Sequence, residues 1–118
     1  MIVEIRTAAE ALAVADRLLA ARRGDAALWR SYATSPLAAV LLTTAHANAG
    51  FADLAAVRDL LVGTSSESDH DLESRWGSVA DRCPHRLLGD GLLLNVAGLS
   101  PVQRDSLLVT ALDALTLA

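Results

Sequence analysis

The chain has 118 residues, the length of a single domain, and 53% of them are hydrophobic while only 3% are aromatic. Fourteen acidic residues outweigh ten basic ones, and the net charge of −4 argues against a free-standing DNA-binding protein. All ten basic residues are arginines. The lack of lysine excludes a P-loop nucleotide site, because that motif uses a lysine to reach the β- and γ-phosphates.

Targeting signals are absent from the printed sequence. Its single cysteine, Cys83, has no partner for an internal disulfide, and residues 1–6 lack the basic and long apolar regions of a secretory signal. No apolar stretch reaches the roughly 20 residues that a membrane-spanning helix needs. We therefore expect a cytoplasmic domain that makes no direct membrane contact.

The first quarter of the chain begins with residues 2–6, which alternate apolar and charged side chains as a short strand or a linker does. Thr7 and Glu10 fit a capping box, in which each side chain accepts a hydrogen bond from the other's backbone N–H, and Gly24 ends the helix. Asp25 then caps a shorter helix. The face of the first helix predicted to be buried contains Ala11, Leu12, Ala15, Leu18 and Leu19.

Residues 36–49 are the predicted centre of the domain. Ser35 is placed to cap this helix, and Pro36 occupies the first helical position, where a missing N–H costs nothing. Gly50 can adopt the left-handed conformation that closes a helix. No residue of the segment carries a fixed charge, so the helix must be covered on nearly every side, and His46 is expected in the core.

The second half of the chain continues the helical pattern. Residues 51–62 form a helix that ends at Gly63, and a polar loop over 64–68 leads to a helix that Pro84 ends. The side chains expected to face inward on the first of these helices are Leu54, Val57, Leu60 and Leu61.

The segment from Pro84 to Leu99 is the least regular. A turn is expected at residues 89–91, and residues 92–94 start either a helix or a buried extended run, as core or as a surface for another domain. Ser100 and Pro101 open the last helix. The expected fold is an all-α compact bundle of about six helices around a central apolar helix (residues 36–49), in a single domain spanning residues 1–118.

Several landmarks follow one another in a distinctive order. They are residues 8–19, residues 28–32 (Leu-Trp-Arg-Ser-Tyr), residues 35–49, residues 54–61, Trp76, residues 103–107 and residues 110–111. This order resembles the all-α domain of the conjugative coupling proteins, the membrane-anchored ATPases of type IV secretion (the TraG and TrwB group). The Walker motifs of that family are not in this sequence, as in an excised domain.

The resemblance implies a domain that is excised from, or inserted in, a larger ATPase anchored at the inner face of the cell membrane. It further implies that the domain faces the cytoplasm and contacts the parent ATPase domain. There it would help to recognise a relaxase, relaxosome proteins, the processed single-stranded DNA or secreted protein cargo.

The densest charge cluster lies in residues 67–73. It is suited to docking a basic partner or, with its alternating carboxylates, to weak divalent-metal binding. It is equally typical of a solvated helix start whose acids complement the helix dipole, and we favour that interpretation. The candidate partner-binding residues are Glu67, Asp69, His70, Asp71 and Glu73.

One basic region lies near Trp29 and Tyr32. Arginines beside aromatic rings can hold single-stranded nucleic acid through phosphate contacts and stacking. A solvated helix end explains the same pattern, and the aromatic side chains are needed for packing. The candidate nucleic-acid contacts are Arg17, Arg22, Arg23 and Arg30.

Zinc-type ligands are present but are not spaced as a zinc site requires. Structural zinc sites use four ligands in closely spaced pairs, whereas His46 and His70 are isolated and Cys83 and His85 form a single pair. Cys83 and His85 are also too close in sequence to present a nucleophile and its base to each other. We expect no catalytic residue, no metal and no cofactor.

The sequence therefore predicts a non-catalytic substrate-recognition domain of a conjugative coupling protein. The alternative is a small helix-turn-helix transcriptional regulator, with residues 51–61 and the next helix as the pair. The polar stretch 63–68 is longer than the three or four residues of such a turn and argues against it. A small hydrolase or metal enzyme is a third class, which no group of residues supports.

Overall fold

Helices dominate the computed structural model, which describes residues 2–20, 27–65 and 79–117. The two short strands, β1 (Ile2–Glu4) and β2 (Phe51–Asp53), pair antiparallel, with Val3 opposite Ala52. The helices are α1 (Ala8–Ala20), α2 (Ala27–Ala47), α3 (Leu54–Ser65), α5 (Arg86–Ala97) and α6 (Pro101–Leu117), and residues 79–82 are also helical. The predicted all-α bundle is confirmed.

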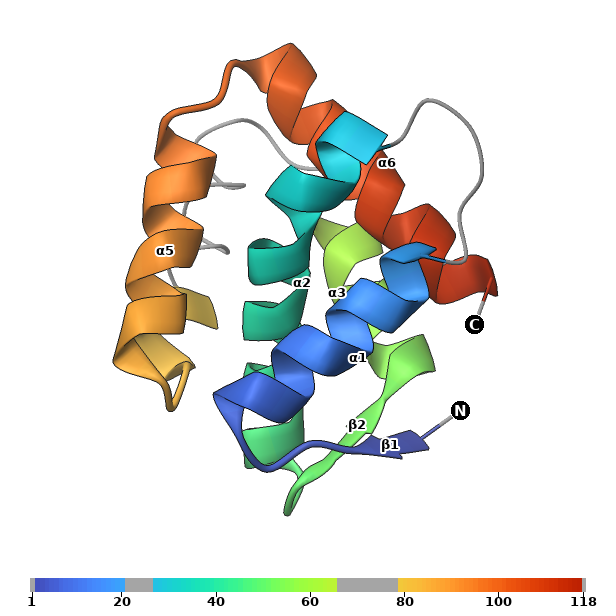
Figure 1. The fold of residues 1–118 in the computed structure, drawn as a ribbon, viewed down its shortest axis with the longest axis vertical. Coiled ribbons are helices and arrows are strands. Elements are labelled where there is room, and N and C mark those ends of the chain that lie inside the picture. The colour runs from blue at the N-terminus through green and yellow to red at the C-terminus, as the bar shows by residue number, and fades with distance from the viewer. Residues whose placement is uncertain (1, 21–26, 66–78, 118) are drawn as a thin grey trace.

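Helix α2 is the centre of the molecule (Figure 1). It contacts α1, α3, α5, α6 and β2, and every residue from 36 to 43 is buried. Val40 and Leu41 are completely inaccessible, and Leu42 is 3% exposed. The central apolar helix predicted from the sequence is confirmed, because a helix with apolar residues all round must be covered all round.

The predicted start of this helix at Ser35 and Pro36 is wrong. The shorter helix expected after Asp25 and the core helix are one continuous helix, and Pro36 lies inside it. A proline there removes one backbone hydrogen bond and crowds the carbonyl four residues earlier. Ala33 and Leu37, on either side of it, are 1% and 2% exposed, so burial of both halves outweighs that cost.

The end of α2 is formed by a tight turn over residues 48–50. The N–H groups of Asn48 and Gly50 both donate to the Ala45 carbonyl, at 3.0 and 2.7 Å. Gly50 has φ +96°, which confirms its predicted left-handed role, and Ala49 also has a positive φ of 56°. The helix therefore ends at Ala47, two residues earlier than predicted.

Helix α1 begins with half of the predicted capping box. The Glu10 N–H donates to Thr7 Oγ1 at 3.1 Å, but the Thr7 hydroxyl, and not its N–H, donates to the Glu10 carboxylate at 3.4 Å. Leu12, expected inside, is 38% exposed, and Leu18 is half-buried. The buried face is Ala11, Val14, Ala15 and Leu19.

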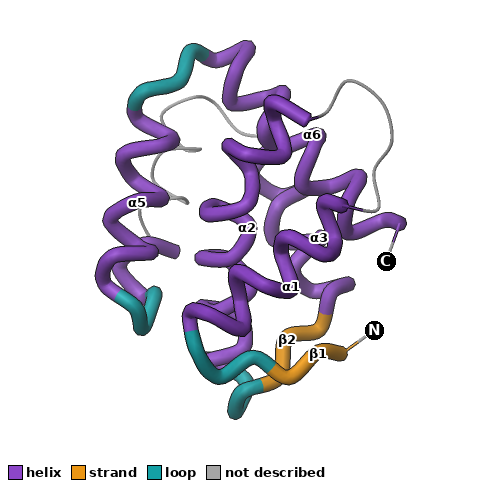
Figure 2. Tube along the Cα trace, viewed as in Figure 1, coloured by secondary structure: helices purple, strands orange, loops and turns teal. Residues whose placement is uncertain are grey.

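The two-stranded ribbon closes one end of the helical body (Figure 2). The strand pattern predicted for residues 2–6 is confirmed by β1, but residues 51–53 are a strand and not the first turn of a helix. Helix α3 starts at Leu54, where the Asp53 carboxylate accepts the Ala55 N–H at 3.1 Å, and it continues past Gly63 to Ser65. Its predicted buried side chains, Leu54, Val57 and Leu61, are confirmed, and Leu60 is half-buried.

The turn predicted at residues 89–91 is wrong, because these residues lie within α5. Gly89 allows α5 to approach the preceding helical residues closely: a Cβ on it would lie 2.7 Å from the Ala80 carbonyl oxygen. The helix stop at Pro84 is confirmed, and the next helix is capped by His85, whose Nδ1 accepts the Leu88 N–H at 3.3 Å.

Helix α6 begins where Ser100 and Pro101 predict. The Gln103 N–H donates to Ser100 Oγ at 3.2 Å, and the Ser100 N–H donates to the Gln103 side-chain oxygen at 2.9 Å, which completes a reciprocal capping box. Leu108 and Leu115 are buried and Leu112 is half-buried. None of the described helices combines the length and apolar character that crossing a membrane demands.

Candidate functional site

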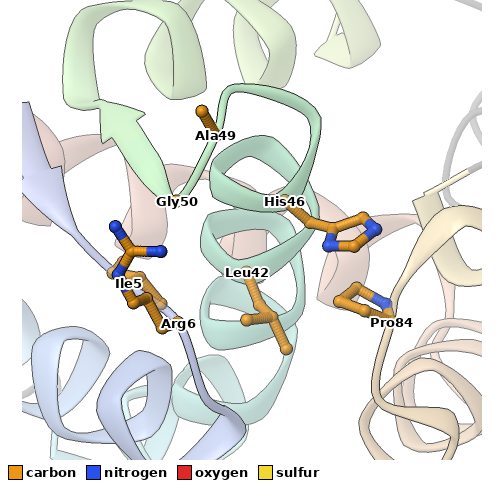
Figure 3. A pocket seen from close by; sticks show the side chains of 7 residues that line it. All are labelled: Ile5, Arg6, Leu42, His46, Ala49, Gly50 and Pro84. Atoms are coloured by element: carbon orange, nitrogen blue, oxygen red, sulfur yellow. The ribbon is translucent and has the colours of Figure 1, made fainter.

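A cleft of about 320 Å³ opens at the C-terminal end of α2 (Figure 3). Three parts of the chain form it: the segment after β1, the last turns of α2 with the following turn, and the loop before α5. Its lining residues are Ile5, Arg6, Leu42, His46, Ala49, Gly50 and Pro84. Polar and apolar atoms share its surface about equally, and such a mixture can orient a small ligand.

Arg6 is the fixed charge of the cleft. Its Nε donates to the Glu4 carboxylate at 2.5 Å, and its guanidinium carbon lies 5.9 Å from the centre of the Phe51 ring. The hydrogen bond with Glu4, and then the negative charge of that carboxylate, raise the pKa of Arg6 above its ordinary value. The group also lies against Gly50, where a Cβ would come within 3.1 Å of the guanidinium.

His46 lies at the cleft and not in the core, so its predicted burial is wrong. Leu42 and Ala45 of α2 are buried nearby, whereas His46 itself is exposed. Figure 3 shows its ring beside Pro84, with Leu42 between it and Arg6. Within the described part of the chain the ring makes no hydrogen bond.

A second feature is an apolar surface on α5. Leu92 is completely buried, but Leu87 and Leu94 are 78% and 76% exposed, and Leu93 is 40% exposed. We call Leu87, Leu93 and Leu94 the α5 leucine face. The sequence left open whether residues 92–94 are core or contact surface. They are helical, with Leu92 in the core and Leu93 and Leu94 on the surface.

The charges beside the α5 leucine face belong to Arg86 and Asp90, which form an exposed ion pair at 3.8 Å. Val102, at the start of α6, is a further apolar side chain that is 76% exposed. In the described part of the chain, α5 and the first turn of α6 thus expose large apolar side chains beside one ion pair.

Most of the residues singled out from the sequence as sites lie outside the described residues. The whole acidic cluster, residues 67–73, is among them, as are Arg22 and Arg23. Arg30 is in α2, but its side chain is outside the description, and Arg17 is exposed near the end of α1. The two clusters therefore remain predictions.

Two of the zinc-type residues considered from the sequence, Cys83 and His85, make local hydrogen bonds instead. The Cys83 thiol donates to the His85 carbonyl at 3.5 Å, and His85 Nδ1 accepts the N–H of Leu88. His70 lies outside the described residues. Over residues 2–20, 27–65 and 79–117, no three His, Cys, Asp or Glu side chains gather as metal ligands would.

A second hollow, of about 350 Å³, runs along another side of α2 beside α3. Several of its polar side chains already have structural partners: Thr43 donates to the Ala39 carbonyl at 2.7 Å, and Asn48 donates to the Phe51 carbonyl at 3.2 Å. Asp53 caps α3. The first cleft is the better candidate, since Nη1 and Nη2 of Arg6 make no hydrogen bond within the described residues.

This cleft was not predicted from the sequence. Arg6 and Gly50 are far apart in sequence and meet because β1 pairs with β2, a long-range contact that no local pattern indicates. Pro84 was recognised as a helix stop only.

Comparison of the chain with protein-family models, with curated proteins and with solved structures gives no match.

Proposed function

We propose that this chain is a non-catalytic recognition domain that binds another protein through the α5 leucine face. The observation that carries the proposal is the exposure of Leu87 and Leu94, at 78% and 76%, seven residues apart and therefore on one side of α5. Leucine in water forgoes the free energy of burial, about 2 kcal/mol for a full side chain. Large apolar side chains exposed on one side of a helix are typical of a contact with another protein.

Within this class, the order of sequence landmarks favours the all-α domain of a conjugative coupling protein. On that proposal the leucine face meets either the parent ATPase domain or the cargo, a relaxase, a relaxosome protein or a secreted protein. Single-stranded DNA is a further proposed ligand through Arg17, Arg22, Arg23 and Arg30. The domain would act in the cytoplasm, beneath the membrane that anchors its parent.

The test is binding of the purified domain to a purified relaxase, to secreted cargo proteins and to the parent ATPase domain, measured by calorimetry. Leu87→Ser and Leu94→Ser are each expected to weaken binding at least tenfold, because each removes apolar surface from the contact. Leu12→Ser, on α1 and 38% exposed, is the matched control and should leave affinity unchanged.

Binding that the α5 variants leave unchanged would contradict the proposed surface, and a lack of binding to all three partners would contradict the recognition role. A gel-shift assay at moderate salt addresses the helix-turn-helix alternative. A sequence-specific duplex complex there would favour the regulator. A Walker A motif upstream and a Walker B motif downstream in the parent gene would support the coupling-protein assignment.

A further inference from the structure

We propose that the cleft at the end of α2 binds a small organic acid. The carboxylate would pair with Arg6, and the apolar body would lie on Leu42 and Pro84. This site is independent of the protein-binding role proposed for α5. Its ligand is a small molecule with both a negative charge and an apolar part.

The anionic end is assigned from the state of Arg6. Its Nε is used by Glu4, while Nη1 and Nη2 make no hydrogen bond within the described residues. The guanidinium is held in place from three sides, by the Glu4 carboxylate, the Phe51 ring and the Gly50 backbone. A planar guanidinium can present two parallel donors to a carboxylate, and these contacts reduce the side-chain freedom that binding removes.

The apolar end is assigned from the rest of the lining. Ile5 and Leu42 are 1% and 3% exposed and form the base of the hollow, and Pro84 supplies a wall (Figure 3). The volume of about 320 Å³ is near the lower limit of ligand sites, roughly 300–1,000 Å³, so the ligand is small. An inorganic anion would leave this apolar surface unused.

The far side of the cleft adds specificity. His46 lies across Leu42 from Arg6, and its ring can exchange a hydrogen bond with a second polar group of the ligand (Figure 3). The turn that follows His46 forms another wall, and the Asn48 and Gly50 N–H groups both donate to the Ala45 carbonyl there. Ala49, a residue with a side chain, is kept at φ 56° in this wall, and backbone strain of that kind is frequent at binding sites.

The experiment is a titration of the isotopically labelled domain, followed by the amide resonances of Leu42, His46 and Gly50. Sodium benzoate is the probe, benzamide its neutral counterpart, and inorganic phosphate the anion without an apolar part. Benzoate is expected to give saturable shifts at these three residues, with affinity at least tenfold higher than benzamide or phosphate. Equal affinities for benzoate and benzamide, or for benzoate and phosphate, would overturn the assignment.

Variants test the role of Arg6 directly. Arg6→Gln should weaken benzoate binding at least tenfold, while Arg58→Gln, an equal change of charge at an exposed position on α3, should have no effect. Glu4→Gln should tighten binding severalfold, because the carboxylate that competes for the guanidinium is removed. Equal effects of Arg6→Gln and Arg58→Gln, or weaker binding by Glu4→Gln, would refute the site, and circular dichroism verifies that each variant is folded.

Discussion

At the scale of single residues, the turn between α2 and β2 holds two positive φ angles in succession. Gly50 at φ +96° is in a conformation that side chains disfavour, and a Cβ there would lie 3.1 Å from the Arg6 guanidinium. We expect Gly50→Ala to lower the free energy of unfolding by about 1–2 kcal/mol. Ala49→Gly should raise it by about 0.5–1 kcal/mol, since strain at φ 56° is relieved. Urea denaturation measures both, and changes of the same sign would contradict the argument.

Residue by residue, the sequence predicts burial well where periodicity is unambiguous. Leu54, Val57 and Leu61 are inside as expected, because the i, i+3, i+7 spacing defines one face of α3. On α1, apolar residues occupy more positions than a single face holds. Leu12 was therefore predicted to be buried although it is exposed, and the burial of Val14 was not predicted. The exposure of His46 could not be read from its neighbours, since it depends on where α1 and α5 lie around α2.

At the scale of elements, α5 contains two glycines with opposite expected effects. Gly89 faces the Ala80 carbonyl oxygen, 2.7 Å from an added Cβ, whereas among the described residues a Cβ on Gly91 would meet nothing nearer than Ser35 Oγ at 3.8 Å. Gly89→Ala should destabilise the domain by about 1–3 kcal/mol through overpacking. Gly91→Ala should stabilise it by about 0.5–1 kcal/mol through helix propensity. Thermal unfolding followed at 222 nm measures both, and a neutral Gly89→Ala would show that the close approach is unimportant.

Which elements could be predicted depends on how local their causes are. Helix α6 starts at its Ser-Pro signal because the capping box with Gln103 is complete within four residues. The same Ser-Pro signal at Ser35 does not start a helix. Burial of Ala33 and Leu37, on either side of Pro36, favours a continuous helix instead. The β1–β2 pair was missed for a similar reason: residues 51–53 become a strand only when residues 2–4 lie beside them.

At the scale of the whole molecule, the central helix could be predicted from the sequence and the candidate cleft could not. The composition of α2 dictates its burial whatever the topology. The cleft requires β1, the end of α2 and the loop at Pro84 to meet, and their separation along the chain leaves no pattern to recognise. The leucines of α5 are an intermediate case: their apolar character was evident, but exposure depends on which side of α5 packs against α2.

Because α1, α3, α5, α6 and β2 all contact α2, damage to its core should be felt by the entire domain. Leu41→Ala removes three buried carbon atoms from a side chain with no exposed surface, and we expect a loss of about 2.5–5 kcal/mol. The whole free energy of unfolding of a domain of this kind is only ~5–15 kcal/mol. The control, Leu94→Ala at a position 76% exposed, should change the free energy of unfolding by less than about 0.5 kcal/mol.

Calorimetry of the Leu41→Ala protein provides the measurement. The midpoint of thermal unfolding should fall by roughly 10–20 °C. Unfolding should remain one transition whose calorimetric and van't Hoff enthalpies agree. Agreement of the two enthalpies follows if every packed element depends on the same helix. Two separate transitions, or an equal loss in Leu94→Ala, would mean that α2 does not organise the domain, because part of the structure would then survive the loss of its centre.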